Sequence, residues 1–208
     1  MRIYYVLAVV LSLLQCACSQ RPQFTLAQQW QTAGLRTPES VLIVGEGAAA
    51  QVYVSQIDGN GGEADGKGEI ALLTPDGSLV DADWITGLNA PKGMAAFENR
   101  LYVADLTELV IIDIAQKQIV QKLPLPQAKF ANDVAVDKNG VVYAKTTQGL
   151  MCIAETALPN GKKSYSFRMV ETGGFNNIFP LDKNNVWFSK HEQGLYKLHM
   201  QPNGTWQK

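Results

Sequence analysis

Short runs of alternating apolar residues, each ended by turn residues, follow one another along most of the chain. The clearest example is the stretch 130–144, where apolar side chains alternate through Val134, Val136 and Val142 around the turn residues Asp-Lys-Asn-Gly at 137–140. A period of two indicates strands, and this arrangement predicts a β-hairpin. No segment has a convincing apolar period of 3.6 residues, so we expect helices to be minor.

This hairpin pattern occurs in four copies, each with a polar head, an apolar strand, a turn, a strand centred on an aromatic residue, and a third strand. The central aromatic residues recur at intervals of roughly 40 to 50 residues. They are Tyr53, Tyr102, Tyr143 and Trp187. The expected third strands are 69–73, 109–113, 150–153 and 195–198, and the expected fourth strands are 84–86, 119–123 and 165–169.

Repeats of this length with about four short strands are typical of an all-β fold of the β-propeller type. An all-β sandwich with regularly spaced strands is the alternative, but repeated polar heads have no role in a sandwich. We therefore predict about four propeller blades and expect the central aromatic residues to pack between blades rather than to bind sugars.

The composition is that of a globular protein with a sizeable core. The chain has 208 residues, of which 46% are hydrophobic and 18% charged, and 18 basic residues nearly balance 19 acidic ones. No basic surface favours nucleic acid or an acidic membrane. Cys152 lies in an apolar run and is expected to be a small buried residue.

The N-terminal segment has a pattern of its own. A charged start followed by the apolar run 6–14 predicts a secretory signal over residues 1–18, and Cys16 and Cys18 follow it in a sequence that resembles a lipobox. We expect an exported protein, lipid-anchored through Cys18 or Cys16 at the periplasmic or envelope side, with simple secretion as the alternative. Residues 19–36 are predicted as a spacer and 37–208 as a partial propeller domain.

Polar residues occupy equivalent positions at the four heads: Glu39, Lys92, Asn132 and Asn176. The innermost strands of a propeller line its channel, so these side chains are expected to form a ring. Carboxylate and amide oxygens suit calcium or another divalent cation. A Gly- and Asp-rich loop at 55–68 is expected to lie over the channel mouth, where it could contact a ligand. Asp105 and Asp133 are candidates for acids or bases, although capping of turns is the simpler role.

The motifs Pro-Glu-Ser at Glu39, Phe-Ala-Asn-Asp-Val-Ala-Val-Asp at Asn132, Phe-Asn-Asn-Ile at Asn176 and the 55–68 loop resemble the gluconolactonase/regucalcin family of six-bladed propellers. This resemblance implies that Glu39 and Asn176 bind a divalent cation and that Asn132 lies beside it and helps to bind substrate or water. Together with Asp133 and Lys92, Asn132 forms the expected substrate-binding set.

The chain also departs from that family. The family takes a further metal-binding aspartate, which serves as the base in lactone hydrolysis, from a blade later than the one with Asn176. The four predicted blades do not include that later blade, so the catalytic acidic residue is unknown here. Lys92 would oppose a metal among the heads unless it points away or pairs with a neighbour such as Asp133. Three interpretations stay open: a fragment of a longer reading frame, which we favour, a four-bladed ring, or assembly with another copy through open blade edges.

Two functions follow from these patterns. The first is an exported, divalent-metal-dependent lactone or ester hydrolase of gluconolactonase type that acts on a small lactone or sugar-derived ligand. The alternative is a non-catalytic propeller that binds a ligand or protein at the cell envelope. The head residues favour the first function, and the missing acidic blade favours the second.

Overall fold

A computed structural model describes residues 27–173, 175–182, 184–190, 194–203 and 205–207, without the side chains of 175–177, 181, 182 and 190. The chain divides into two compact units, 1–31 and 32–208, and every described strand belongs to the second. Residues 1–26, with Cys16 and Cys18, lie outside the described part, so the signal peptide, the lipid anchor and export stay predictions. No helix among the described residues is long and apolar enough to cross a membrane.

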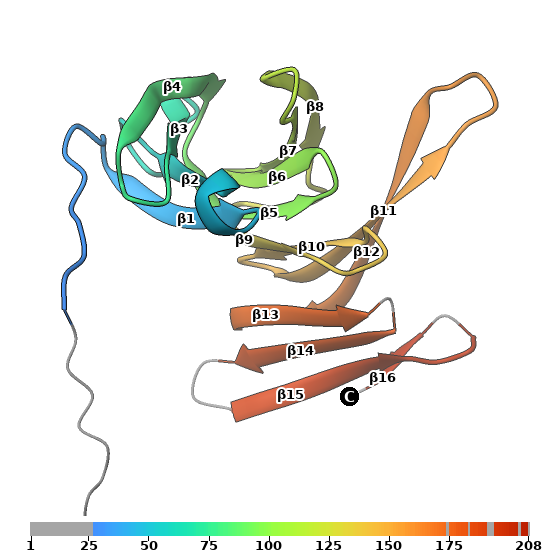
Figure 1. Ribbon diagram of the computed structural model, residues 1–208. Coiled ribbons are helices and arrows are strands. Elements are labelled where there is room, and N and C mark those ends of the chain that lie inside the picture. Colours follow the sequence, from blue (N-terminus) through green and yellow to red (C-terminus); the bar gives the residue numbers. More distant parts are fainter. Residues whose placement is uncertain (1–26, 174, 183, 191–193, 204, 208) are drawn as a thin grey trace, which may run out of the picture. The chain divides into compact units, whose positions relative to one another are not determined.

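The described strands form four antiparallel sheets of four strands each, and within each sheet the strands pair in sequence order (Figure 1). The first sheet comprises β1 (Pro38–Val44), β2 (Gln51–Gln56), β3 (Gly68–Leu73) and β4 (Leu79–Leu88). The second comprises β5 (Pro91–Phe97), β6 (Arg100–Asp105), β7 (Glu108–Asp113) and β8 (Gln118–Pro124).

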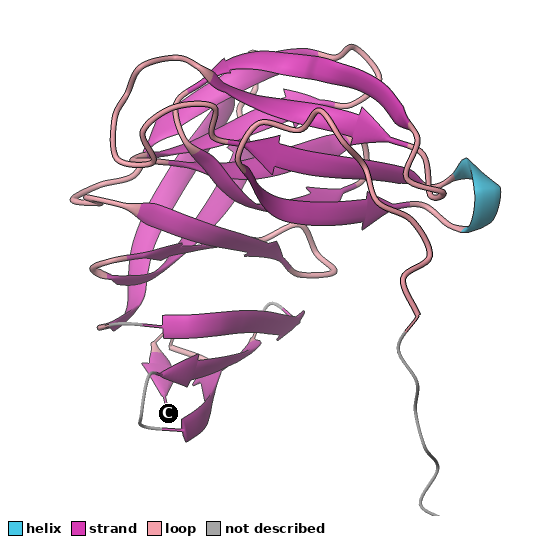
Figure 2. Cartoon of the chain, turned by 90° about the vertical axis from the view of Figure 1, so that its left-hand side faces the viewer, coloured by secondary structure: helices cyan, strands magenta, loops and turns pink. Residues whose placement is uncertain are grey.

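The third and fourth sheets repeat this plan. The third comprises β9 (Ala131–Val136), β10 (Val142–Thr146), β11 (Gly149–Ala157) and β12 (Lys163–Thr172). The fourth comprises β13 (Phe175–Asp182), β14 (Asn185–Lys190), β15 (Gly194–Met200) and β16 (Trp206–Gln207). Strands and loops make up the described chain apart from one short 3₁₀-helix, η1 (Gly47–Ala49) (Figure 2). The all-β propeller architecture with four blades is therefore confirmed, and β16 adds a strand that the pattern did not predict.

Local turn chemistry explains how each hairpin forms. In the β9–β10 hairpin, the Oδ1 atom of Asp137 accepts hydrogen bonds from the backbone N–H groups of Asn139 (2.8 Å) and Val141 (3.0 Å). Gly140 takes a φ of 82°, which a residue with a side chain rarely adopts. This turn fixes the register, so Val142 pairs with Val136 and Lys145 with Asp133.

The core lies between consecutive sheets rather than on one face of each. Alternate residues of β6 point in opposite directions: Leu101 and Val103 pack in a cluster with the first sheet, whereas Tyr102 and Ala104 pack in a cluster with the third. A third buried cluster joins the third and fourth sheets. Because both faces of a middle sheet are covered, its strands read as continuous apolar runs rather than as the half-polar strands of a solvated sheet.

The central aromatic residues show this packing with one difference. Tyr53, Tyr102 and Tyr143 are buried in the three inter-sheet clusters, as predicted. Trp187 is 37% exposed, because its neighbour Phe188 is the residue that packs against the third sheet. Trp187 therefore points away from the third sheet, and no described sheet covers that face. Cys152 is buried, as predicted, and burial raises the pKa of its thiol to about 11.

The outer faces of the first and fourth sheets carry exposed apolar side chains. These residues are Val41 and Ile43 on β1, Phe179 on β13, Trp187 on β14 and Leu195 on β15. The repeat pattern predicted open blade edges and did not predict these exposed faces. Self-association through open blade edges stays a prediction.

Ile111→Ala is expected to lower the free energy of unfolding by about 2 to 5 kcal/mol, because it leaves a cavity in the cluster between the second and third sheets. Ile43→Ala is the matched control in an exposed strand position and is expected to cost about 1 kcal/mol or less. Urea unfolding of both variants measures the difference. Equal losses would contradict a core located between the sheets.

Candidate functional site

The predicted head residues lie on the first strands of successive sheets. Strand β5 is in contact with both β1 and β9, so Glu39 on β1, Lys92 on β5 and Asn132 and Asp133 on β9 come from three neighbouring strands. Asn176 belongs to β13, which contacts β9, but its side chain lies outside the described part. We call the region formed by Glu39, Lys92, Asn132 and Asp133 the mouth.

The strands β5 and β9 approach unusually closely at the mouth. A Cβ atom on Gly93 would lie 2.1 Å from Oδ1 of Asp133 and 2.7 Å from its Cα atom. Since the second contact is with backbone, no rotation of a side chain would relieve it. Glycine at this position therefore lets the residue after Lys92 sit directly against Asp133.

Lys92 is almost completely buried, with 4% of its surface exposed. Its Nζ atom lies 4.9 Å from the centroid of the Phe130 ring, within the range of a cation–π interaction. On another side, a Cβ atom on Gly61 would lie 3.7 Å from this Nζ, so the loop between β2 and β3 passes over the ammonium group. This is the contact with the mouth that the sequence predicted for the loop.

The pairing of Lys92 with Asp133 that the sequence suggested is not found among the described residues. Lys92 forms no hydrogen bond or ion pair with any described residue. The register of the third sheet instead pairs Asp133 with Lys145. Burial raises the pKa of Asp133, and the charge of Lys145 opposes that rise. Lys145 is thus a neighbour of the mouth that sequence reasoning missed, although the turn at 137–140 fixes the register that pairs it with Asp133.

The charges at the mouth act on one another. The Glu39 side chain is exposed, yet partial loss of solvent raises its pKa. The positive charges of Lys92 and Lys145 lower this pKa, and the negative charge of Asp133 raises it. Burial also raises the pKa of Asp133, against the hydrogen bond from the Val134 N–H group (2.9 Å). Two carboxylates and two ammonium groups therefore share one electrostatic environment.

Asp105 serves as a cap rather than as a mouth residue. Its buried carboxylate accepts hydrogen bonds from the backbone N–H groups of Asn89 (2.9 and 3.0 Å) and Ala90 (2.7 Å). Burial raises its pKa, and these hydrogen bonds oppose the rise. The carboxylate thus fixes the corner that leads into Pro91 and Lys92, and Asp105 positions Lys92.

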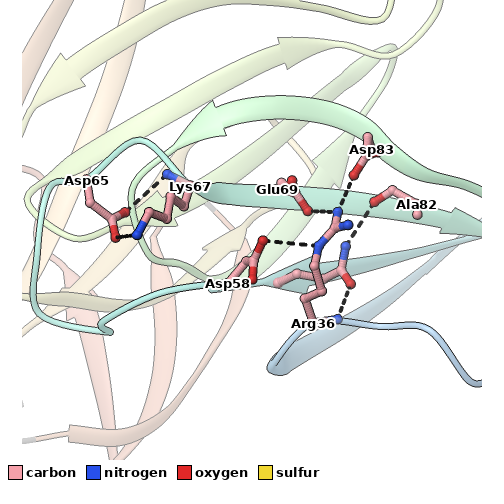
Figure 3. Close-up of polar contacts among 8 residues, drawn as sticks. Arg36, Asp58, Asp65, Lys67, Glu69, Ala82 and Asp83 are labelled. Atoms are coloured by element: carbon pink, nitrogen blue, oxygen red, sulfur yellow. Dashed lines mark hydrogen bonds and ion pairs between the residues drawn. The ribbon is translucent and has the colours of Figure 1, made fainter.

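A network around Arg36 fixes the entry into β1 and one end of the loop (Figure 3). The guanidinium group pairs with Asp58 (Nε to Oδ2, 3.2 Å) and contacts the carboxylates of Glu69 and Asp83. The buried Gln56 side chain accepts a hydrogen bond from the backbone N–H group of Arg36 (2.6 Å) and donates one to the backbone carbonyl of Ala82 (2.9 Å). Arg36 is therefore held against the first sheet. The spacer over 19–36 stays a prediction.

The other end of the loop is also held in place. Oδ1 of Asp65 accepts a hydrogen bond from the Lys67 N–H group (3.1 Å), and a Cβ atom on Gly59 would lie 2.5 Å from Oδ2 of Asp65. The loop therefore closes on itself between Gly59 and Asp65. Anchored at Asp58 and at Asp65, it carries Gly61 across Lys92.

The described donors do not fit a divalent cation by themselves. No group of three or more histidine, cysteine, aspartate or glutamate side chains is placed to hold a metal ion within the part of the chain that the structure describes. Two ammonium groups act on Glu39, the one head carboxylate. Calcium binding by Glu39 and Asn176 stays a prediction that depends on side chains outside the described part.

A separate hollow of about 270 Å³ lies between the second and third sheets, away from the mouth. Phe97, Arg100, Tyr102 and Lys163 contribute to its lining, and Arg100 pairs there with Glu155 (2.6 Å). It contains none of the predicted site residues, and Arg100 and Lys163 both pair with Glu155. We therefore assign the candidate site to the mouth.

Comparison with solved structures supports the fold. A gluconolactonase from Xanthomonas campestris is similar over 85% of this chain and 62% of its own, with a TM-score of 0.54 and 16% identity. A virginiamycin B lyase from Staphylococcus aureus, solved as an inactive variant with quinupristin, is similar over 85% of this chain and 56% of its own (TM-score 0.57, 13% identity). A protein of unknown function from Desulfotomaculum acetoxidans gives a TM-score of 0.56 at 15% identity over 83% of this chain and 57% of its own.

The chain thus spans between 56% and 62% of the length of these three proteins. At such low identity, the likeness shows a common propeller-type fold and no more. No protein-family model and no curated protein matches the sequence.

Gly93→Ala is expected to lower the free energy of unfolding by about 1 to 3 kcal/mol, because the new methyl group would overlap the Asp133 backbone. The matched control is Gly61→Ala, whose methyl group would meet only ordinary contacts at 3.6 and 3.7 Å. We expect this control to change stability by about 0.5 kcal/mol or less. If thermal and urea unfolding find Gly93→Ala as stable as Gly61→Ala, the close approach of β5 and β9 is wrong.

Proposed function

We propose that the protein hydrolyses a lactone or a related ester of gluconolactonase type at the mouth. The observation that carries this proposal is the gathering of Glu39, Lys92 and Asp133 on three neighbouring first strands, where their charges act on one another. The propeller-type fold shared with a gluconolactonase supports it. If residues 1–18 act as a signal, this chemistry takes place at the cell envelope.

Lactone hydrolysis needs a positive group at the carbonyl oxygen and a base for the attacking water. The water oxygen bonds to the carbonyl carbon, the ring C–O bond breaks, and the proton of the water ends on the released alkoxide to give a hydroxy acid. The Lys92 ammonium group is the proposed donor to the carbonyl oxygen, which gains negative charge in the transition state. Its buried surroundings make this interaction stronger than in water.

Two carboxylates at the mouth are candidates for the base. Glu39 is exposed and so is accessible to a water molecule, whereas Asp133 is half-buried beside Gly93. The pKa of each is raised by loss of solvent, which brings it closer to neutral pH and makes it a better base. The Asn132 amide is the proposed partner for substrate hydroxyl groups.

A non-catalytic binding module is the second candidate. Lys92 favours it, because a buried ammonium group without a described hydrogen-bond partner suits recognition of an anionic ligand whether or not chemistry follows. The ligand would then be retained unchanged.

Removal of the base is expected to lower kcat for lactone hydrolysis by about 100- to 10,000-fold. We expect this loss in either Glu39→Gln or Asp133→Asn, and a smaller change in the other variant. Glu46→Gln, at an exposed position before η1, is the matched control and is expected to keep full activity. Acid release from a panel of five- and six-membered sugar lactones, corrected for spontaneous hydrolysis, measures the rates. A wild-type protein no faster than the blank would favour the binding module.

Calcium, if held by Glu39 and Asn176, is expected to raise the melting temperature of the wild-type protein, because an ion that binds only the folded state stabilises it. Glu39→Gln is expected to lose most of this increase. Differential scanning fluorimetry with calcium and with a chelator measures both. Equal increases in the two proteins would remove Glu39 from the metal site, and no increase in the wild type would argue against a calcium site at the mouth.

A further inference from the structure

The outer face of the fourth sheet carries large exposed apolar side chains that lie side by side. Trp187 is 37% exposed, and the strand register places the exposed Phe179 directly opposite it. Leu195 is 67% exposed and lies opposite Ser189, two residues from Trp187 and so on the same face. Phe179, Trp187 and Leu195 therefore form one patch across β13, β14 and β15, which we call the fourth-sheet patch.

The repeat indicates what kind of surface this patch contacts. In the first three sheets, the residues equivalent to Trp187 and Leu195 are buried against the sheet that follows, and none is more than 5% exposed. The equivalents of Trp187 are Tyr53, Tyr102 and Tyr143, and by register those of Leu195 are Ile70, Leu109 and Leu150. The fourth-sheet patch therefore matches the faces that pack on a following sheet of this fold.

The first sheet exposes a face of the receiving kind. Neighbouring sheets meet through the first strand of the later sheet: β5 contacts β1 and β2, β9 contacts β5 and β6, and β13 contacts β9 and β10. In the first sheet this strand is β1, whose Val41 and Ile43 are 62% and 64% exposed and point away from the second sheet, since Leu42 packs toward it. At the position of Val41, the second and third sheets have Met94 and Val134, both buried in inter-sheet cores. We call Val41 and Ile43 the β1 patch.

The rest of this outer face of the first sheet is already covered. Val52 and Val54 on β2 lie opposite Ile43 and Val41, yet both are buried, and Leu35 packs against their cluster. Leu35 thus leaves β1 free, which is the strand through which a preceding sheet makes its contacts.

We propose that the fourth-sheet patch of one molecule docks on the β1 patch of a second copy of this chain. Both patches are exposed in the same molecule, so neither covers the other, and a second copy presents the matching face. The contact would repeat the sheet-on-sheet packing that the chain already makes three times. Because two different patches meet, the interface is heterologous, and it generates a closed ring or a longer open assembly. The proposal is independent of the proposed function.

One residue of the fourth sheet departs from the buried pattern. Lys197 is exposed and lies directly opposite Trp187, at a position where the first three sheets bury apolar residues. Those residues are Leu72, Ile111 and Cys152. The aliphatic stem of Lys197 can lie along Trp187 while its ammonium group stays in water, but the contact is weaker than a fully apolar one. Association is therefore expected to be reversible.

Sedimentation velocity of the full 208-residue chain over a range of concentrations tests the proposal. The wild type is expected to form dimers or larger species as concentration rises. Trp187→Lys and Ile43→Lys are each expected to weaken this association at least about thirtyfold, because each would bury an unpaired charge in the contact. Val120→Lys, at an exposed apolar position on β8, is the matched control and is expected to associate like the wild type. A monomeric wild type, or equal association in all four proteins, would overturn the proposal.

A mixture of the two variants tests the direction of the contact. Trp187→Lys keeps an intact β1 patch, and Ile43→Lys keeps an intact fourth-sheet patch. Each variant alone is expected to stay monomeric, whereas an equimolar mixture is expected to form heterodimers and nothing larger, because one intact pair of patches remains. Association of Ile43→Lys at the strength of the wild type would mean that fourth-sheet patches bind one another. That result, or a mixture without heterodimers, would contradict the proposal.

A substitution that strengthens the contact separates specific docking from general loss of structure. Lys197→Leu restores the apolar character of its equivalents and is expected to tighten association at least about tenfold. Ile43→Lys in the same chain is expected to cancel this gain, and a gain that persists would reveal non-specific contact and exclude the β1 patch. Circular dichroism and thermal melting verify folding of every variant. Leu195→Lys and Val41→Lys replace, on the same patches, a variant that fails to fold.

Discussion

Burial of both faces of each middle sheet is the constraint on which the rest of this structure depends. In β6, one set of alternate residues packs toward the first sheet and the other set toward the third, so a solvent-facing position is missing along the strand. Buried polar side chains are therefore found near the beginnings and ends of these strands, as with Lys92, Asp105 and Thr146. The location of the mouth follows from this packing, because the first strands of neighbouring sheets lie side by side and their polar ends meet.

Contacts around the mouth position the strands and the loop that form it. Gly93 allows the backbone of β5 to touch Asp133, and Asp105 holds the corner before Lys92 through three hydrogen bonds. The Arg36 network fixes the entry to β1, and Asp58 and Asp65 hold the ends of the loop above Lys92. Contacts made outside the mouth thus hold β1, β5 and the loop in place, which is what a binding site needs to keep its geometry before a ligand arrives.

The repeat, the hairpins and most strand positions could be predicted from the sequence because they depend on local chemistry. Alternation sets the strand, and a capped turn such as that at Asp137 sets the register. What failed depends on contacts between distant residues. Alternation tells which face Trp187 occupies but not whether another sheet covers that face. Composition likewise does not reveal the contacts of Arg36, which pairs with acids up to 47 residues away in the sequence.

The candidate site shows the same division. The head positions of Glu39, Lys92 and Asn132 follow from the repeat alone, since equivalent positions in successive blades must be neighbours. The partners of these residues do not follow from it. Lys145 opposite Asp133 required the hairpin register, and the burial of Lys92 between Phe130 and Gly61 required the path of an irregular loop. Loop paths are set by scattered contacts such as those of Asp58 and Asp65, which leave no periodic trace in a sequence.

Lys92 also changes what the polar heads mean. From the sequence, the oxygen donors at three heads predicted a metal site, and the positive charge of Lys92 at the fourth head opposed that prediction. In the structure, that cation is buried, held over an aromatic ring and covered by a loop, so its position is fixed by the fold rather than tolerated at the surface. A fixed ammonium group beside Glu39 already supplies the positive charge that an ion would bring. The electrostatics of the mouth are therefore organised around Lys92, and an added divalent cation would have to bind against it.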